Sequence, residues 1–474
     1  MRDEPKTEPK AVAEALAGLI GAGNVLTGAA AAAHFEEPRG LYHQKALAVA
    51  TPRSVADVQK LLAWANGAGV KIVPQGGNTG LVGGQVPDRA GEVIVSLRHL
   101  RDVREVDAEA GVLIVEAGLT VAEAQRIAEQ RGLLFPLSLG SEGSAQIGGV
   151  LSTNAGGVNV LAYGNTRDFC LGIEAVLADG RLYQGLSPLR KDNTGYSLRN
   201  LFIGAEGTLG IITAASFRLY PRPVLFETAL VNVASPAEAV RLYEHLRAAG
   251  GNRLTSIELL PRFAIELELK HELIERDPSA SMSPWYVLCE FSLFGADAPG
   301  ALAAALEGAL EKGIVTDAAI AETLGHRALM WKMREAISEC QTREADSIKH
   351  DVSVPVAAVP ALIEEAIASV VKLVPGIRPF AFGHMGDGNI HFDFLQPVGM
   401  EGPPFRSQEA EIHAAVYGVV AKLGGSVSAE HGIGQMKVHL LEEVKDPVAL
   451  EMMRALKRAL DPNNILNPGK VLRG

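Results

Sequence analysis

The sequence predicts an α+β protein with more than one domain. The chain has 474 residues, which is more than one ordinary hydrophobic core accommodates. Short strand-like segments alternate with amphipathic segments that carry helix-capping signals, and glycine-rich joints connect them. The 50 glycines indicate loops in which backbone closely approaches backbone or a ligand. We therefore expect two or three domains and a ligand site built from glycine-rich loops.

Local signals divide the chain into three parts. Residues 1–221 form the first, with a core over 42–221, and Pro221 and Pro223 mark its end. Residues 222–425 form a second α+β part. Residues 426–474 form a C-terminal segment that we expect to return to the first part. Asp179-Gly180 predicts a hairpin turn.

Composition excludes several classes of function. The net charge of -11 argues against nucleic acid as a partner, because phosphate binding requires a concentrated basic surface. Cys170, Cys289 and Cys340 lie far apart and offer neither a disulfide framework nor iron–sulfur spacing. The stretch from Met1 to Lys10 is polar, and no apolar run reaches the roughly 18–20 residues that span a bilayer. These features predict a cytoplasmic protein without a membrane span.

A glycine-rich loop follows the predicted strand that starts at Lys71. Gly76-Gly-Asn-Thr-Gly80 and Gly83-Gly84 offer a row of backbone N–H groups that can hold a phosphate. Neither a G-x-G-x-x-G turn opening a helix nor a P-loop is present, so neither the nicotinamide Rossmann site nor a nucleotide triphosphate site is supported. Taken alone, the segment is equally well explained as a surface loop.

The second half contains histidines and an acid between glycines. Residues 378–384 and 390–396 read as strands joined by a glycine turn, which could bring His384 and His391 together. Two imidazoles suit a borderline divalent metal, and Glu430 or His431 offers a third ligand or a base. The plain alternative is that these are ordinary core or surface histidines.

Cationic side chains could bind an anionic substrate. Arg334 and Ser338 share a face of a helix predicted over 327–340, and Lys349 lies in a strand predicted over 347–354. A guanidinium fork and an ammonium can together hold carboxylates. Spacing alone leaves open that both are solvated surface charges.

Several glycine-rich motifs follow one another along the first part in a recognisable order. The motifs are Gln75-Gly-Gly-Asn-Thr-Gly80, Pro136-Leu-Ser-Leu-Gly-Ser141, Gly148-Gly-Val-Leu-Ser-Thr-Asn-Ala-Gly-Gly157, Tyr163-Gly164 and Gly204-Ala-Glu-Gly-Thr-Leu-Gly-Ile-Ile212. Together they resemble the FAD-binding domain of the vanillyl-alcohol oxidase / p-cresol methylhydroxylase family. The resemblance implies a two-part FAD domain, a substrate (cap) domain and a non-covalent flavin, because 75–85 and 136–157 contain no His or Cys to tether it. The FAD contacts that it implies are Pro74, Gln75, Gly76, Gly77, Asn78, Thr79, Gly80, Leu81, Ser138, Gly140, Ser141, Gly148, Gly149, Thr153, Asn154, Gly157, Tyr163, Gly164, Glu206, Gly207, Gly210, Ile211, Ile212 and Asn467.

Residues 222–472 resemble the substrate half of the D-lactate / D-2-hydroxyglutarate dehydrogenase and glycolate oxidase group, and the pattern is closest to the D-2-hydroxyglutarate dehydrogenases. The matching motifs are Met333-Arg-Glu-Ala-Ile-Ser338, Lys349-His-Asp-Val-Ser-Val-Pro355, Gly383-His-Met-Gly-Asp-Gly-Asn-Ile-His391, Ser428-Ala-Glu-His-Gly-Ile-Gly434 and Asp461-Pro-Asn-Asn-Ile-Leu-Asn-Pro-Gly-Lys470. The resemblance implies the metal ligands His384, His391 and Glu430, the catalytic base His431, and the substrate contacts Arg334, Ser338, Lys349, Asp393 and His431. Two positions depart from the pattern: Ser338 replaces a Thr, and Asp393 replaces an Asn and would repel a dicarboxylate.

The implied activity is oxidation of a D-2-hydroxy acid by metal-assisted hydride transfer to FAD. D-2-hydroxyglutarate is the first expected substrate, with D-lactate or D-malate as alternatives. Zn²⁺ is the expected metal, with Mn, Co and Fe as alternatives. Electrons would leave to an electron-transfer flavoprotein, a quinone or a cytochrome. A flavin electron-transfer subunit without its own substrate site and a metallohydrolase are the rival functions, and the sequence leaves the oligomeric state open, a homodimer included.

Overall fold

A computed structural model describes residues 8–473, so most of the polar stretch from Met1 to Lys10 lies outside the described residues. The chain separates into two compact units. Unit 1 comprises the residues up to Gly156, Asn165–Pro221 and those from Glu430 on, whereas unit 2 comprises Gly157–Gly164 and Arg222–Ala429. Unit 1 is thus assembled from three stretches of sequence. Within 8–473, no helix is long and apolar enough to cross a membrane.

The N-terminal part of unit 1 is built on a four-stranded sheet in the order β1-β2-β4-β3. Strands β2, β4 and β3 are parallel, and helices α1 and α2 pack against them. Helix α2 has Ser54 as its N-cap, and the Ser54 side chain accepts a hydrogen bond from the Asp57 backbone N–H. The elements are α1 (Pro9–Ile20), η1 (Ala22–Asn24), β1 (Val25–Leu26), η2 (Gly28–His34), β2 (Ala48–Ala50), α2 (Val55–Ala68), β3 (Lys71–Gln75) and β4 (Glu92–Ser96).

A five-stranded antiparallel sheet, in the order β5-β6-β10-β8-β9, forms the rest of the unit 1 core. The hairpin predicted at Asp179-Gly180 is confirmed, since β8 and β9 pair across it and Gly180 has φ 85°. Thr120 and Glu123 form a capping box at the start of α3. The elements are β5 (Val103–Asp107), β6 (Val112–Glu116), α3 (Val121–Glu129), β7 (Leu133–Leu134), α4 (Ile147–Thr153), α6 (Thr166–Phe169), β8 (Cys170–Val176), β9 (Leu182–Gly185), α7 (Arg199–Phe202), β10 (Ile211–Arg218) and β11 (Tyr220–Pro221).

The C-terminal segment extends the first sheet of unit 1. Ile72 on β3 donates its backbone N–H to Ile465 (2.7 Å) and accepts from the backbone N–H of Asn467 (2.7 Å). The buried side chains of Ile465 and Leu466 join the same core as α1 and α2. Two helices precede this strand-like contact, α15 (Val438–Val444) and α16 (Pro447–Leu460).

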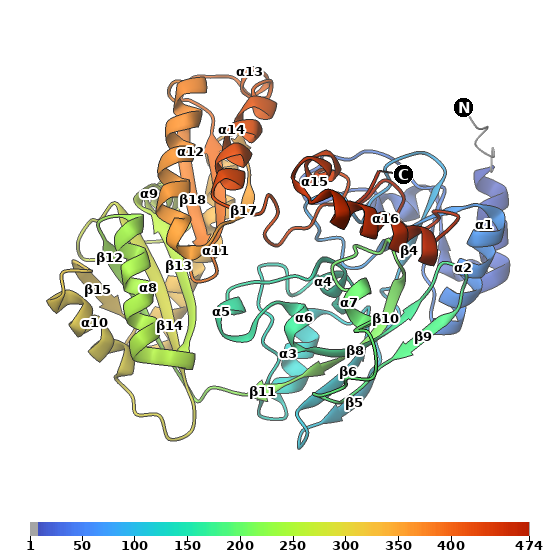
Figure 1. Ribbon diagram of the computed structural model, residues 1–474, viewed down its shortest axis with the longest axis horizontal. Coiled ribbons are helices and arrows are strands. Elements are labelled where there is room, and N and C mark those ends of the chain that lie inside the picture. The colour runs from blue at the N-terminus through green and yellow to red at the C-terminus, as the bar shows by residue number, and fades with distance from the viewer. Residues whose placement is uncertain (1–7, 474) are drawn as a thin grey trace. The chain divides into compact units, whose positions relative to one another are not determined.

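Unit 2 consists of one large sheet with helices packed against it (Figure 1). Its sheet runs in the order β15-β12-β14-β13-β18-β19-β16, and β17 also pairs with β19. Helices α9 and α11 bury their apolar faces against β12, β13, β14 and β18. The predicted hairpin of strands β18 and β19 is confirmed. The elements are α5 (Val160–Tyr163), β12 (Leu225–Val233), α8 (Pro236–Gly250), η3 (Gly251–Arg253), β13 (Leu254–Pro261), α9 (Arg262–Lys270), β14 (Trp285–Leu293), α10 (Ala301–Glu311), β15 (Asp317–Ile320), α11 (Leu324–Glu344), β16 (Ser347–Ile348), β17 (Asp351–Ser353), η4 (Val356–Ala358), α12 (Val359–Leu373), β18 (Arg378–His384), β19 (Asn389–Leu395), α13 (Gly402–Arg406) and α14 (Glu409–Lys422).

Candidate functional site

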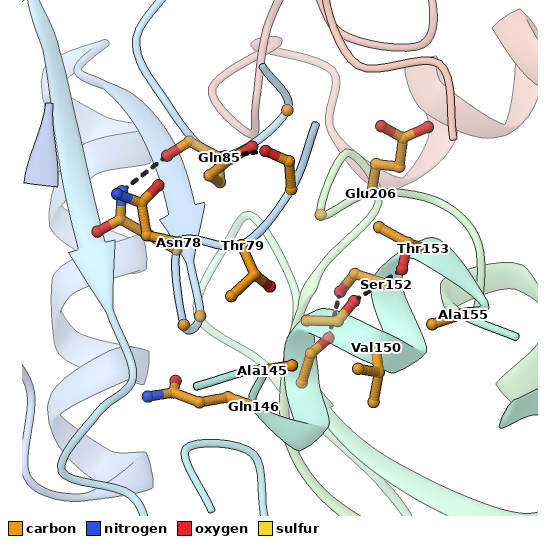
Figure 2. A pocket seen from close by; sticks show the side chains of 18 of the residues that line it. Asn78, Thr79, Gln85, Ala145, Gln146, Val150, Ser152, Thr153, Ala155 and Glu206 are labelled. Carbon is orange, nitrogen blue, oxygen red and sulfur yellow. Dashed lines mark hydrogen bonds between the residues drawn. The ribbon is translucent and has the colours of Figure 1, made fainter. Parts of the chain in front are cut away.

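Unit 1 contains a cavity of about 490 Å³, a size typical of small-molecule and cofactor sites. Three glycine-rich stretches form most of its wall: the loop after β3, the segment around α4, and the turn before β10. In Figure 2, Asn78, Thr79 and Gln85 lie on one side, and Val150 and Thr153 of α4 lie on the other. Loops separated by more than a hundred residues therefore meet around one space.

Most of the residues expected to contact FAD line this cavity. They are Pro74, Gln75, Gly76, Gly77, Asn78, Thr79, Gly80, Leu81, Gly140, Ser141, Gly148, Gly149, Thr153, Glu206, Gly207, Gly210, Ile211 and Ile212. Gly157, Tyr163 and Gly164 belong to unit 2.

Three other expected contacts do not line this cavity and instead form hydrogen bonds within unit 1. The Asn154 side chain accepts from the backbone N–H of Arg167 (2.9 Å). Asn467 donates its amide to the carbonyls of Gly84 and Glu206 (2.9 and 2.8 Å). The hydroxyl of Ser138 donates to the Glu142 carboxylate (3.4 Å).

Two glycines show why this wall excludes larger side chains. A Cβ on Gly77 would lie 1.8 Å from the Ser144 carbonyl oxygen, which no side chain can tolerate. Gly207 has φ 73°, and a Cβ there would lie 2.9 Å from Cγ of Pro74. The backbone therefore forms the cavity surface directly, as a bound diphosphate requires.

Polar side chains in the wall fit a polar, extended cofactor such as FAD. Within residues 8–473, the buried Asn78 Oδ1 and Gln146 Oε1 have no hydrogen-bond partner. Both residues line the cavity, so their polar side chains can contribute to contacts with a bound ligand. Gln85 and Gln146 line the cavity but were not predicted from the sequence, because no local pattern marks them.

Glu430 and His431 line the same cavity of unit 1 as the glycine loops. Nε2 of His431 lies 3.7 Å from Oε1 of Glu430, so the two side chains form an acid–imidazole pair at the cavity surface. Both residues were predicted to be functional, and the described geometry brings them to the expected cofactor site. A base placed here would face a bound cofactor directly.

The loop after His431 is held by the buried carboxylate of Glu206. Its oxygens accept hydrogen bonds from the backbone N–H groups of Ile433 and Gly434, both at 2.7 Å. Burial raises the pKa of Glu206 to about 7, although these two N–H groups act in the opposite direction. Glu206 also has φ 51°, so its backbone sits in the left-handed region at a turn of the cavity wall.

In unit 2, the β18–β19 hairpin brings His384 and His391 together as predicted. Their ring centroids are 5.5 Å apart. Nδ1 of His384 lies 2.7 Å from Oε1 of Glu258, and because a carboxylate accepts, Nδ1–H donates. Nε2 is then the atom that would bind a metal, an arrangement common in metalloproteins, so the donor set fits a borderline divalent ion.

Glu258 was not predicted from the sequence, yet it also binds Arg334. Its Oε2 accepts from Nε of Arg334 at 2.7 Å, and the carboxylate is 1% exposed. Burial alone would raise the pKa of Glu258, but His384 and Arg334 outweigh it and lower the pKa to about 2. Ser338, expected on the same face of α11 as Arg334, is exposed, whereas Arg334 is buried.

Lys349 lies in the short break between β16 and β17, two strands that both pair with β19. Nζ donates to Oε1 of Gln341 (2.9 Å) and lies 3.9 Å from Oδ2 of Asp393. Asp393 also accepts from the backbone N–H of His350 (3.2 Å). The Asp393 carboxylate, which the sequence singled out as a departure, therefore partly compensates the Lys349 charge within unit 2.

Asp351 is a further candidate metal ligand that was not predicted from the sequence. It is the cross-strand partner of His391, and a ligand atom of each lies within 4.8 Å of the other. The backbone N–H of Ala429 donates to the Asp351 carbonyl (3.3 Å), so the segment leading to Glu430 runs beside β17. This neighbourhood is not readable from sequence, because it depends on strand register.

Comparison with known families assigns both parts of the chain. Residues 222–471 match the family described as FAD linked oxidases, C-terminal domain, and residues 46–185 match the FAD binding domain family. The first match covers more than half of the chain. The chain therefore belongs to the family of FAD-linked oxidases.

Curated relatives resemble the chain along nearly its whole length. A protein of Xanthomonas citri pv. viticola named D-2-hydroxyglutarate dehydrogenase is 36% identical, with 90% of this chain and 89% of the relative covered. A Bos taurus protein named D-2-hydroxyglutarate dehydrogenase, mitochondrial, is 37% identical, with 89% and 76% covered. The expected family resemblance is thus confirmed.

Solved structures confirm the expected fold. A structure of p-cresol methylhydroxylase with substrate bound has a TM-score of 0.76 at 18% identity, covering 99% of this chain and 98% of the other. An alkyldihydroxyacetonephosphate synthase has a TM-score of 0.71 at 18% identity, covering 99% and 86%. At such low identity these likenesses establish the fold alone, which is a p-cresol methylhydroxylase-type FAD domain joined to an α+β substrate domain.

Proposed function

We propose that the chain is an FAD-dependent dehydrogenase that oxidises D-2-hydroxyglutarate to the 2-oxo acid. The observation that carries this proposal is the cavity of unit 1, where the glycine loops of an FAD-binding fold and the Glu430–His431 pair share one wall. The names of relatives that are 36–37% identical over most of the chain support the substrate. A flavin subunit without its own substrate site has no use for such an acid–imidazole pair.

FAD binding is proposed to be non-covalent. The stretches 75–85 and 136–157, which supply most of the cavity wall, contain neither His nor Cys. The wall would hold the diphosphate by backbone N–H groups and the rest of the cofactor by apolar contact and by Asn78 and Gln146. Denaturation should then release the yellow cofactor into solution.

His431 is proposed to remove the hydroxyl proton of the substrate. A neutral imidazole carries a nitrogen lone pair that can accept a proton, and this side chain lies at the cavity surface, where it can reach a substrate beside the cofactor. When bound, FAD would supply the acceptor for the C2 hydride, and a divalent metal would supply Lewis acidity toward the C2 hydroxyl. The protein supplies orientation: Arg334 and Lys349 are the proposed carboxylate contacts, with Ser338 and Asp393 as further candidates.

The proposed metal ligands are His384, His391 and Glu430. Support comes from the two close imidazoles of unit 2 and from the Glu430 carboxylate at the cavity surface of unit 1. Zn²⁺ is proposed first, and Mn, Co and Fe would serve the same donor set.

A second substrate candidate rests on Asp393. Because this carboxylate lies 3.9 Å from Nζ of Lys349, it can replace the second carboxylate of a dicarboxylic acid. D-lactate, which has a single carboxylate, would then be oxidised by the same residues, and D-malate is the shorter dicarboxylate alternative. The proposed electron acceptor is a separate electron-transfer flavoprotein, quinone or cytochrome. The proposed location is the reducing cytoplasm, in which the three free, buried cysteines would stay reduced. The oligomeric state is to be tested, with a homodimer as one candidate.

A substrate panel tests the proposal. The purified protein is loaded with FAD and Zn²⁺ and assayed with a dye acceptor against D- and L-2-hydroxyglutarate, D-lactate and D-malate. D-2-hydroxyglutarate should exceed D-lactate in kcat/KM by at least about tenfold, since one lost charged contact costs more than about 1.4 kcal/mol. If no D-2-hydroxy acid bleaches the flavin, the proposal is overturned. If D-lactate has the highest kcat/KM, the second candidate is selected.

A further inference from the structure

Glu258 divides its two carboxylate oxygens between two functional side chains. It lies on β13 directly opposite His384 of β18, in an antiparallel pair. Oε1 accepts from Nδ1–H of His384, and Oε2 accepts from Nε–H of Arg334 on α11, both at 2.7 Å. All three residues belong to unit 2. One buried carboxylate therefore joins a proposed metal ligand to a proposed substrate contact.

The hydrogen bond to His384 selects a tautomer. A neutral imidazole carries one N–H, and a carboxylate partner requires that proton to be on Nδ1. Nε2 then carries the lone pair that a metal needs, and the ring is held in a fixed plane. Without the carboxylate, both tautomers would be populated, and the cost of selecting one would reduce the free energy of metal binding.

The hydrogen bond to Arg334 orients the guanidinium. Because Glu258 uses Nε, the two terminal amino groups are the ones that can form a fork to a substrate carboxylate. The guanidinium carbon also lies 5.0 Å from the ring centroid of Phe382, which restricts the side chain from another direction. Arg334 is only 9% exposed, so an uncompensated charge at this depth would be costly.

Another buried pair in unit 2 shows what a purely structural arrangement looks like. Glu290 on β14 is 3% exposed and accepts from Nε and Nη2 of Arg327 on α11 at 2.7 and 2.8 Å. It also accepts from Trp331 (2.9 Å) and Thr228 (2.6 Å), and none of these partners is a histidine. Glu290 thus gives the guanidinium a two-pronged contact, whereas Glu258 gives Arg334 one oxygen and reserves the other for His384.

We propose that Glu258 is a positioning residue that prepares the metal site and the substrate site together. It holds His384 in the Nε2-binding tautomer and Arg334 in the orientation that meets a carboxylate. This inference rests on the proposed function, because it takes His384 as a ligand and Arg334 as a substrate contact. Its consequence is that metal affinity and substrate affinity fall together when the Glu258 charge is removed.

The test compares Glu258→Gln with Glu290→Gln, each purified with FAD bound. Competition with a chromogenic chelator measures the Kd for Zn²⁺, and steady-state assays with D-2-hydroxyglutarate measure kcat and KM. Glu258→Gln should weaken Zn²⁺ binding by about 10–100-fold, the usual effect of losing such a partner. It should also raise KM at saturating Zn²⁺ and leave FAD content unchanged. Glu290→Gln should leave the Zn²⁺ Kd within about twofold of wild type, since its carboxylate binds Arg327, Trp331 and Thr228, which are not proposed metal ligands.

A measurement on the wild type keeps the inference testable if Glu258→Gln does not fold. Histidine-selective ¹⁵N labelling of the FAD-loaded protein, with His384 assigned through His384→Gln, reports the tautomer before Zn²⁺ is added. An Nδ1–H tautomer is expected, and an Nε2–H tautomer would overturn the inference. Unchanged Zn²⁺ affinity in Glu258→Gln, or an equal loss in Glu290→Gln, would do the same. Failure of the wild type to bind Zn²⁺ or to oxidise any D-2-hydroxy acid would instead refute the proposed function.

Discussion

Replacing Glu268 by Gln should stabilise unit 2 at alkaline pH. Glu268 on α9 is 0% exposed, and within residues 8–473 neither side-chain oxygen has a hydrogen-bond partner. Burial raises its pKa from 4.5 to about 8, although the Arg334 charge acts in the opposite direction. The folded chain therefore keeps a proton that the unfolded chain releases above about pH 4.5, and the wild type loses stability as pH rises toward about 8. Each pKa unit corresponds to about 1.4 kcal/mol, so the loss is at most about 5 kcal/mol.

Urea unfolding followed by tryptophan fluorescence measures this difference, because Trp285 and Trp331 both lie in unit 2. Glu268→Gln should match the wild type near pH 5 and exceed it by about 2–5 kcal/mol near pH 9, since glutamine carries no charge at either pH. Glu266→Gln, which changes an exposed acid of the same helix, is the matched control and should show no such pH dependence. A stability difference that stays constant with pH would refute the reasoning, because it would mean that Glu268 is ionised in the fold at low cost.

Three further predictions concern the proposed site. His431→Ala should lower kcat by about 10²–10⁴-fold and keep the flavin spectrum, and wild-type turnover would exclude His431 as the base. Gly77→Ala would place a Cβ 1.8 Å from the Ser144 carbonyl oxygen, so FAD content after gel filtration should fall, whereas Gly67→Ala, with nothing within 4 Å of its Cβ, should retain FAD. Lys349→Met should raise KM for D-2-hydroxyglutarate at least about tenfold more than for D-lactate, and equal increases would show that Lys349 does not hold a second carboxylate.

Local chemistry explains which parts of the fold could be predicted from the sequence. Ser54, Thr120 and the Asp179-Gly180 turn act on residues only a few positions away, so their capping and turn signals are visible in the sequence itself. The break of the predicted strand 347–354 into β16 and β17 was not visible, because it arises where the His350 backbone N–H bonds to the Asp393 side chain. Such a contact depends on the partner strand and leaves no trace in local periodicity.

The candidate site, too, could be predicted from the sequence only in part. The glycine loops and the histidine motifs were recognisable because each is compact and chemically distinctive. Glu258 was not, since it lies 126 positions from His384 and reads as a single acid within an apolar strand. Only the pairing of β13 with β18 makes it a partner of the imidazole. Gln146 was missed for a similar reason: only the fold brings it into the cavity wall beside the glycine loops.

The pairing of Ile72 with Ile465 and Asn467 has a consequence for synthesis of the protein. Strand β3 carries the loop that forms one wall of the cavity, yet its edge is completed only by residues made after the whole of 222–429. At translation rates of about 5–20 residues per second, residues 8–221 wait roughly 10–50 s on the ribosome before their sheet can be finished. During that interval the inserted unit can fold first, while the backbone N–H and C=O of Ile72 still lack the partners that Ile465 and Asn467 later provide.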